Sequence, residues 1–552
     1  MSQHKDHDEN GRGLSRRALM AGSAGRAALG TARAARENRG AAWPAAAIGS
    51  SALRNAPVAP FDSFRDYIEA IEAWGLVVRV PRMDQDHYEI TAMMYRLIDE
   101  FGWYEAPAIL VEEVRIDGQW IRGPVICNHQ GHWYTEAIVF GVQPVPNDGR
   151  QTYRNAMAHL RNLLVDGEYP RIPPVEVERA SAPCKEIVLT GDDIDLTKYA
   201  FIQSNPADSG RYINTGSTFT DDPVIGKNFG TYRCELRGPR LIGINPEPNQ
   251  TAWRTFMAAK ERGDKTVRIS IVVGQDPVTW MISGSRIVNR LSKEKVDELA
   301  IAGGMRGKAI EVVRSETNEH MIPAHAEMII EGEVPLDTMM PEGPFGEMYQ
   351  YLGSRRPENF IVNVTAVTHR KNPWILNQFT GVTRGYVTGP TAVLFNESLR
   401  RLVPGMIEIH SPVDTTGLTY VKIKKTKPGE GIEVGRKLAR IIPIYKIIVV
   451  VDDDVDILDS KQVNMAIGSR WQPGSASLIL EGLRGMPLDP SIDRDGKTSK
   501  IVIDATIQWP EEGGPETFAE LNRTLLEKMA PESFERVDRK WGAVVTRKLT
   551  TF

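Results

Sequence analysis

The sequence predicts a multidomain protein of mixed α+β and α/β class. Its 552 residues are enough for about three or four domains. Closely spaced β-rich runs from about residue 185 predict a barrel or sandwich, because few helices separate them. After about residue 351, strand and helix signals alternate, which predicts a parallel sheet covered by helices.

The first ordered element is expected to be a helix with a cap at each end. Apolar residues recur at helical spacing over 61–74, Asp62 or Ser63 can cap the start, and Gly75 can end the helix. Leu76–Val80 then fits a strand. Helix and strand signals alternate from there to a proline-rich linker, so we expect the first region to be α/β.

The central region is expected to consist mainly of short strands. A helix over Thr251–Arg262 interrupts them, and the small residues of Ala300–Gly307 fit either a loop or a frayed helix end. Tyr232 and Cys234 alternate with Arg233, which predicts one buried and one open face. The expected strands are Tyr212–Phe219, Gly230–Arg237, Leu241–Ile244, Val267–Val273, Thr279–Ile282 and Ala309–Arg314.

The last part of the chain is expected to form an α/β sheet followed by a polar helix, Glu516–Lys528. The predicted sheet strands are Phe360–Arg370, Leu418–Lys424 and Lys446–Val451, with helices at Thr391–Leu402 and Glu433–Ile441. The predicted division is a flexible tail (1–58), an N-terminal α/β domain (59–180), a central β domain (181–352), a C-terminal α/β domain (353–510) and a helical extension (511–552).

Composition excludes several classes of protein. With 67 Lys and Arg against 71 Asp and Glu, the net charge is −4 and the pI is about 6.3, so the chain lacks the basic surface of a nucleic-acid binder. No uncharged stretch is long enough for a membrane helix. Three separated cysteines, Cys127, Cys184 and Cys234, argue against disulfides and cysteine-based metal sites, which favours a cytoplasmic protein.

The N-terminal tail contains a weak export-like pattern. Ser15–Met20 faintly resembles a twin-arginine signal. The apolar segment that should follow is interrupted by Arg26, Arg33 and Arg36. A flexible tail outside the fold is the favoured interpretation.

Two glutamates flank a short loop of glycine, proline and phenylalanine at Glu342–Glu347. Pro344 and the glycines exclude a regular helix, so we expect a shaped loop. Two acids held close together can acquire different pKa values, so that one keeps its proton while the other stays charged. Residue types alone also fit a solvated acidic turn.

Arg233 is the candidate partner for these acids. It is expected in the middle of a strand, on the face opposite Tyr232 and Cys234. From there it could hold a carboxylate through two hydrogen bonds or pair with a glutamate. A surface ion pair with neighbours such as Glu235 is the alternative.

Other polar patterns carry weaker predictions. Glu327 and Glu331 share a strand face and could be a catalytic pair or simply exposed, and Asp452–Asp456 could hold magnesium or form a solvated turn. His129 and His132 are a weak metal candidate. The chain has no P-loop, no GxGxxG and no HExxH motif.

Taken in order, several of these motifs resemble one family, the UbiD-type decarboxylases that use prenylated FMN. The resemblance covers about residues 60–510, and the Glu-Gly-Pro-Phe-Gly-Glu loop is its most specific part. The matching segments are Phe61–Gly75, Asn228–Arg233, Glu316–Asn318 with Glu327, Glu342–Met348, Lys446–Asp456 and Ser469–Gly474.

The resemblance implies a fold and a reaction. The central region would be a split β-barrel like that of flavin reductases, and the C-terminal domain would oligomerise. The reaction would be the reversible, non-oxidative decarboxylation of an aromatic, heteroaromatic or α,β-unsaturated acid. Arg233 and Glu342 would orient the substrate carboxylate beside the flavin, and Glu347 would donate the proton after carbon dioxide leaves.

The resemblance also implies a cofactor site. Thr231 and Tyr232 would approach the prenylated FMN through their backbone, and Lys437 would bind its phosphate. A divalent metal, manganese or magnesium, and a potassium ion would sit at that phosphate. The metal ligands would be Asn228, Glu298 and, where the family has histidine, Gln250 or the adjacent Asn249; an amide binds manganese more weakly than imidazole does.

The implied partners are a small carboxylic acid, a flavin prenyltransferase that supplies the cofactor, and further copies of the chain in a dimer or hexamer. Phe379, Thr380, Val382 and Thr383 are the candidate residues for substrate specificity. Two alternatives stay open: an FMN-binding split-barrel module that has lost decarboxylation, and a subunit of a carboxylase without activity of its own.

Overall fold

A computed structural model describes residues 50–248, 250–285, 297–384 and 389–545. The chain divides into two units after Arg54. Helix α2 (Ser50–Asn55) begins at the end of the first unit, and the remaining helices and strands belong to the second. The twin-arginine-like pattern and Asn249 lie outside the described residues.

The N-terminal sheet contains four strands in the order β1-β2-β3-β19. Three are sequential, and β19 joins from much later in the chain, parallel to β3. The predicted first helix is confirmed as α3, where Ser63 forms a capping box with Asp66. The elements are α3 (Phe64–Ala73), β1 (Val77–Asp84), α4 (Glu89–Phe101), β2 (Ala108–Ile116), β3 (Gln119–Cys127), α5 (Thr135–Val139), α6 (Gly149–Asn162) and β19 (Ile375–Asn377).

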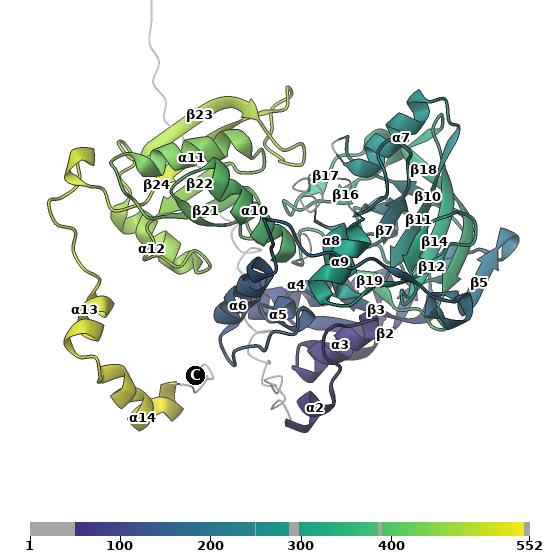
Figure 1. Cartoon of the computed structure of the whole chain (residues 1–552), viewed down its shortest axis with the longest axis horizontal. Coiled ribbons are helices and arrows are strands. Elements are labelled where there is room, and N and C mark those ends of the chain that lie inside the picture. Colours follow the sequence, from purple (N-terminus) through teal and green to yellow (C-terminus); the bar gives the residue numbers. More distant parts are fainter. Residues whose placement is uncertain (1–49, 249, 286–296, 385–388, 546–552) are drawn as a thin grey trace, which may run out of the picture. The chain divides into compact units, whose positions relative to one another are not determined.

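The central region is a sheet of eight strands whose main path runs β10-β18-β14-β11-β7-β8, with β15 and β5 also paired to β18 (Figure 1). All these pairings are antiparallel. Among the described strands the path does not return to its start, so it is not a closed barrel. The strands are β5 (Ile187–Thr190), β7 (Ser217–Thr220), β8 (Asn228–Thr231), β10 (Leu241–Ile244), β11 (Thr266–Val273), β14 (Met328–Pro335), β15 (Met339–Glu342) and β18 (Arg356–His369).

Short strands and helices occur between the strands of this sheet, and short 3₁₀ helices also occur in the N- and C-terminal parts of the chain. Small paired strands are β4 (Val175–Glu176), β6 (Tyr212–Ile213), β9 (Cys234–Glu235), β12 (Glu311–Arg314), β13 (Met321–Pro323), β16 (Phe345–Gly346) and β17 (Leu352–Gly353). The helices are α7 (Thr251–Glu261), α8 (Pro277–Ser283) and α9 (Glu298–Arg306). Short 3₁₀ helices occur at Gln85–His87, Arg179–Ser181, Pro183–Lys185, Gly191–Asp193, Leu196–Lys198 and Pro510–Glu512.

Two expectations for the central region are wrong, and one open alternative is decided. Thr279–Ile282 lies in helix α8 instead of a strand, because Asp276 accepts hydrogen bonds from two backbone N–H groups of the first turn and Pro277 follows it. Of the two interpretations of Ala300–Gly307, the helical one holds, since these residues form most of α9 and its end at Gly307, which has a φ of 70°. The strand expected over Gly230–Arg237 is interrupted at residues 232–233, because β8 pairs with β7 and β9 pairs with β6.

The C-terminal sheet has the order β20-β21-β22-β24-β23. As predicted, it contains parallel strands, namely β21, β22 and β24. Predicted strand Phe360–Arg370 does not belong here, because β18 pairs with β14 and β10 in the central sheet; a boundary at residue 353 is too early for it. The elements are α10 (Gly389–Leu402), β20 (Met406–His410), β21 (Leu418–Ile423), α11 (Glu430–Ile441), β22 (Ile447–Val451), α12 (Ser460–Arg470), β23 (Ser477–Arg484) and β24 (Lys497–Asp504).

The chain after the C-terminal sheet forms two helices with exposed apolar side chains. They are α13 (Asn522–Met529) and α14 (Ser533–Val545). The polar helix expected from Glu516 therefore begins later, at Asn522. In the described parts of the chain, no helix has the length and apolar character needed to cross a membrane.

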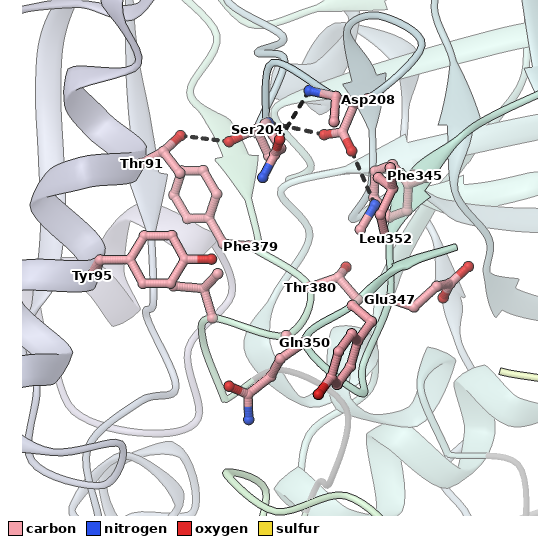
Figure 2. Close-up of a pocket in the computed structure, with 16 residues that line it drawn as sticks. Thr91, Tyr95, Ser204, Asp208, Phe345, Glu347, Gln350, Leu352, Phe379 and Thr380 are labelled. Carbon is pink, nitrogen blue, oxygen red and sulfur yellow. Dashed lines mark hydrogen bonds between the residues drawn. The ribbon is translucent and has the colours of Figure 1, made fainter. Parts of the chain in front are cut away.

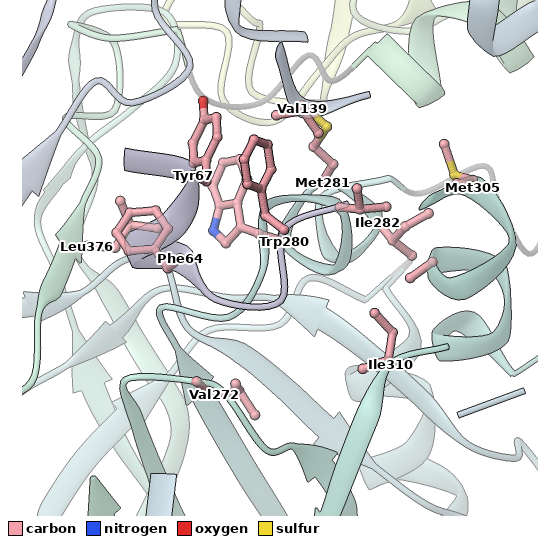
Figure 3. Packing of buried hydrophobic residues seen from close by; sticks show 14 of the residues in the cluster. Phe64, Tyr67, Val139, Val272, Trp280, Met281, Ile282, Met305, Ile310 and Leu376 are labelled. Carbon is pink, nitrogen blue, oxygen red and sulfur yellow. The ribbon is translucent and has the colours of Figure 1, made fainter. Parts of the chain in front are cut away.

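A large buried cluster ties the N-terminal helices to the central region. Phe64 and Tyr67 of α3 pack near Trp280 of α8 (Figure 3), and the ring of His129 lies between them, 5.4 Å from Phe64 and 5.0 Å from Trp280. Burial lowers the pKa of His129 to about 3. His129 is thus a neutral residue of this core, and the described residues contain no group of three His, Cys, Asp or Glu side chains that could hold a metal with it.

Candidate active site

Arg233 lies in the break between two short strands. Its carbonyl accepts a hydrogen bond from the Asn245 backbone N–H at 3.2 Å, while the neighbouring side chains of Tyr232 and Cys234 are buried. The guanidinium is therefore directed away from that core, with only 12% of the side chain exposed. The predicted orientation is confirmed, although Arg233 is not mid-strand.

The two glutamates lie on either side of a shaped loop. Glu342 ends β15, Gly343 has a φ of 80°, and β16 (Phe345–Gly346) pairs with β17. The Glu347 N–H then donates to the Tyr351 carbonyl at 2.9 Å. The predicted loop is confirmed, and both carboxyl groups are buried instead of solvated.

The loop brings both glutamates onto Arg233. The guanidinium donates two hydrogen bonds of 2.8 Å to the two oxygens of Glu342 and a third to Glu347. Its centre lies 5.0 Å from the Phe345 ring. This geometry excludes the surface ion pair with Glu235, whose carboxylate binds Arg237 instead.

Sequence reasoning missed two further groups in this cluster. The Tyr212 hydroxyl donates to Glu342 at 3.1 Å, and the Asn245 amide oxygen, turned toward Arg233, accepts from its guanidinium at about 3.0 Å. Tyr212 is 130 residues from Glu342 in the chain. No local spacing could have revealed that contact.

Electrostatics distinguish Glu347 within the cluster. Burial raises the pKa of the Glu347 carboxyl, although the Arg233 charge acts in the opposite direction. Burial lowers the pKa of Arg233, but its hydrogen bonds to Glu342 and the charges of both glutamates give a net upward shift. The site therefore combines a permanent cation with a carboxyl that retains a proton more readily than usual.

A cavity of about 210 Å³ lies beside Glu347. Figure 2 shows Thr91 and Tyr95 of α4 on one side, and Asp208, Phe345 and Glu347 on the other. Of the expected specificity residues, Phe379, Thr380 and Val382 line it. Thr383 does not, because its hydroxyl donates to the Gln378 side chain at 2.8 Å. The full lining is Thr91, Tyr95, Ser204, Asn205, Ala207, Asp208, Phe345, Gly346, Glu347, Gln350, Tyr351, Leu352, Phe379, Thr380, Gly381 and Val382.

Two of the three predicted metal ligands lie together. The Asn228 amide donates to Glu298 at 2.9 Å, and the Phe229 N–H donates to the same oxygen at 2.9 Å. Gln250 instead precedes α7, where its amide oxygen accepts from the Glu247 N–H at 2.6 Å. Among the described residues there is no group of three His, Cys, Asp or Glu side chains that could hold a metal.

The remaining predicted cofactor residues, Thr231, Tyr232 and Lys437, do not share one set of contacts. Thr231 lies three residues after Asn228, and its hydroxyl is 2.7 Å from that of Ser283 at the end of α8. The Tyr232 hydroxyl accepts from the Ala252 N–H at 3.2 Å. Lys437 lies on α11 with its ammonium 3.1 Å from Glu433, and among the described residues it makes no hydrogen bond or ion pair with β8.

The other acidic candidates stabilise the fold. Glu327 and Glu331 are fully buried, so the exposed-face interpretation is wrong. Glu327 accepts two hydrogen bonds from Arg65, and Glu331 accepts from backbone N–H groups of residues 316 and 317. Asp452 and Asp454 form ion pairs with Arg470. The guanidinium therefore takes the place where the sequence suggested a magnesium ion.

The oxygen-rich set formed by Asn228, Thr231, Ser283 and Glu298 fits a hard cation, for which amide, hydroxyl and carboxylate oxygens are the usual ligands. The two hydroxyls of the set could donate to a phosphate beside such a cation. Buried Thr218, which pairs with Gly230 on β8, has a hydroxyl without a partner. The polar atoms of a flavin could satisfy such a group.

Comparison with known proteins finds one family along most of the chain. Residues 175–383 match the 3-octaprenyl-4-hydroxybenzoate carboxy-lyase Rift-related domain, called UbiD, and residues 386–505 match the C-terminal domain of the same carboxy-lyase. The first match contains Arg233, Glu342 and Glu347. It also extends beyond β18, in agreement with the pairing of that strand in the central sheet.

Individual relatives agree with this match. An uncharacterized protein of Archaeoglobus fulgidus is 30% identical over 66% of this chain and 74% of its own. The phenolic acid decarboxylase of Sedimentibacter hydroxybenzoicus is 28% identical over 82% of this chain and 93% of its own.

Solved structures of similar fold contain flavins. The UbiD-class enzyme HmfF from Pelotomaculum thermopropionicum in complex with FMN has a TM-score of 0.71, 26% identity, and coverage of 85% of this chain and 99% of that chain. An evolved dimeric form of HmfF in complex with prFMN has a TM-score of 0.67, 25% identity, and coverage of 85% and 98%.

Proposed function

Since this chain belongs to the UbiD family of carboxy-lyases, we propose that Arg233, Glu342 and Glu347 form its catalytic centre. The chain is a carboxy-lyase, and its reaction is the decarboxylation of an aromatic acid. Heteroaromatic and α,β-unsaturated acids are further candidate substrates. The observation that carries the proposal is the Arg233 guanidinium held between two buried glutamates, one of which lines a cavity.

The proposed cofactor is prenylated FMN, in line with the flavins bound by HmfF. When bound, the flavin would supply an electron sink for the electron pair left as the bond to carbon dioxide breaks. Thr231, Tyr232 and Arg233 would hold it from the β8–β9 segment. Lys437 is proposed for the phosphate on the family resemblance alone, since its observed partner is Glu433.

Arg233, Glu342 and Glu347 would each have a different role in the reaction. Arg233 would hold the substrate carboxylate by charge-assisted hydrogen bonds, and Glu342 would fix Arg233 through its two 2.8 Å contacts. After the carbon–carbon bond breaks, Glu347 would give its proton to the substrate carbon. The substrate carboxylate and this proton thus yield carbon dioxide and the product, which carries hydrogen in place of the carboxylate. Its raised pKa favours this donor role. The same steps in reverse order would add carbon dioxide to the product, so we propose that the reaction is reversible.

A direct test compares protein produced with and without a flavin prenyltransferase. We expect carbon dioxide release from at least one member of an aromatic-acid panel, and only after co-production with the prenyltransferase. Equal activity of both preparations would contradict the proposal that the reaction requires prenylated FMN. If flavin binds but no acid is turned over, the chain is an FMN-binding module or a subunit that needs a partner.

Replacement of Glu298 by glutamine is expected to lower bound metal and flavin together. Asn228, Glu298 and Gln250 are the proposed ligands for manganese or magnesium, with potassium beside the flavin phosphate. Loss of the carboxylate should reduce metal content by about tenfold or more, the scale on which even residues that support a metal ligand act. Metal analysis and flavin absorbance of the purified protein measure both.

Glu261→Gln, at an exposed position in α7, is the control and should retain both groups. Unchanged metal content in Glu298→Gln would remove this residue from the site. A lower melting temperature of the flavin-free variant would point instead to its hydrogen bonds with Asn228 and Phe229.

The larger assembly is also proposed. The central antiparallel sheet would serve as the split β-barrel of flavin reductases, flanked by the N- and C-terminal α/β domains. The chain would form a dimer or hexamer, for which the exposed apolar side chains of α13 and α14 offer contact surface. Cys127, Cys184 and Cys234 are free and buried, which suits a cytoplasmic location.

A further inference from the structure

A second buried carboxylate, Asp208, lines the same cavity as Glu347 but belongs to a different segment. Asp208 is 6% exposed. One of its oxygens accepts the Gly346 N–H at 3.0 Å, and the other accepts the Asn205 N–H at 3.0 Å (Figure 2). The residue therefore binds the backbone directly before Glu347.

The segment 208–212 supports the glutamate loop at more than one point. The Ser209 N–H donates to the Pro344 carbonyl at 2.9 Å, and the Ser209 and Tyr212 hydroxyls are 2.7 Å apart. Tyr212 in turn contacts Glu342. Asp208 is the member of this segment that reaches the Glu347 end of the loop.

Beyond Glu347 the loop is held by hydrogen bonds of its own and by the segment 414–416, since the Gln350 amide donates to the Asp414 carbonyl at 2.6 Å and the Thr416 hydroxyl donates to the Met348 carbonyl at 3.0 Å. The Glu347 N–H donates to the Tyr351 carbonyl, and the Gln350 N–H donates to the Glu347 carbonyl, both at 2.9 Å. These bonds shape the turn, and the hydrogen bond from Arg233 to the Glu347 carboxyl joins it to the guanidinium. The bond from Gly346 to Asp208 joins the turn to a segment 138 residues earlier in the chain.

We propose that Asp208 is a positioning residue for Glu347, which sets both the place of its carboxyl and its hold on a proton. This role in catalysis rests on the proposed function, whereas the structural part does not. Without the Asp208 carboxylate, the Gly346 N–H loses a charge-assisted bond, and the turn can move relative to Arg233.

The charges around Asp208 define its effect on Glu347. Burial raises the pKa of Asp208 to about 6, Arg233 lowers it and the Glu347 charge raises it. Tyr95 of α4 also faces it, and its pKa is raised by burial and by the Asp208 charge. Because like charges disfavour joint ionisation, an ionised Asp208 helps Glu347 to keep its proton.

The test compares Asp208→Asn with the wild-type chain and with Asp193→Asn, a control at an exposed position. Hydrogen–deuterium exchange of the flavin-free protein should show faster exchange in residues 342–352 of Asp208→Asn, and at Asn205, whose N–H also binds Asp208, with no change in other segments. In the flavin-loaded enzyme, kcat should fall by about tenfold to a hundredfold, the effect of a misplaced catalytic group, while KM changes little. The alkaline limb of the kcat–pH profile should move to lower pH.

Asp208→Glu separates charge from geometry. It should restore the alkaline limb but not kcat, because the charge returns while the reach to Gly346 changes. This variant also serves where Asp208→Asn does not fold.

Unchanged exchange in residues 342–352 would overturn the proposal whatever the activity. A change in KM alone would overturn it too, because it would make Asp208 a substrate contact. If the wild-type enzyme releases no carbon dioxide, the proposed function fails, and the exchange experiment still decides whether Asp208 positions the loop.

Discussion

Glu347→Gln is expected to retain flavin and to lose almost all turnover. Glutamine keeps the size of the side chain and an oxygen that can face Arg233, but it has no proton to give to the substrate carbon. A positioned acid contributes about 10²–10⁴-fold to rate, so kcat should fall by that factor or more. Single-turnover measurements with the flavin-loaded variant would show whether carbon dioxide leaves before protonation fails.

The matched control is Glu358→Gln, which changes an exposed glutamate on β18. It should match the wild type in kcat and flavin content. Full activity of Glu347→Gln would remove Glu347 from the mechanism. Loss of flavin in that variant would show that the residue holds the cofactor in addition to, or instead of, donating a proton.

Arg233→Met is expected to abolish activity and to destabilise the protein in a pH-dependent way. Methionine fills similar space but leaves Glu342 and Glu347 buried without their cation. Removal of one partner of a buried ion pair typically costs about 3–5 kcal/mol. The variant relieves this cost by protonating Glu347, whose pKa burial raises and whose folded pKa, without the Arg233 charge, exceeds its unfolded value further. Stability is therefore retained at low pH and lost as pH rises through the folded pKa of Glu347.

Melting curves at pH 5 and pH 8 measure this effect. The drop in melting temperature relative to wild type should be larger at pH 8. Arg240→Met is the control, because Arg240 is half-exposed and pairs with exposed Asp192, an arrangement worth little. Equal destabilisation of Arg233→Met at both pH values would mean that the two carboxyls are not stabilised by Arg233.

Elements with local signals could be predicted from the sequence. Helix α3 has its cap, apolar stripe and terminating glycine within residues 63–75, and strand β10 was predicted with its observed bounds. Local signals can also conflict. Thr279–Ile282 has the β-branched composition of a strand, but Asp276 and Pro277 start a helix there, and β-propensity is weak against such a start.

Contacts between distant segments could not be predicted in this way. The interruption at Arg233 depends on which strands β8 and β9 pair with, and the partner strand β6 lies about twenty residues earlier. Glu327 appeared to be a surface residue because its partner Arg65 is 262 residues away. The Glu342–Glu347 loop was identifiable from its own residues, whereas Asp208 and Tyr212 were not, since each reaches that loop across more than 120 residues.

The cavity wall formed by α4 has an evolutionary consequence. Thr91 and Tyr95 line the cavity, yet they precede the region matched by the family, which begins at residue 175. Glu347 and the opposite wall of the cavity are thus encoded in separate stretches of the gene. Substitutions in α4 can reshape that wall without altering Arg233, Glu342 or Glu347, so the cavity and the Arg233 cluster can evolve separately.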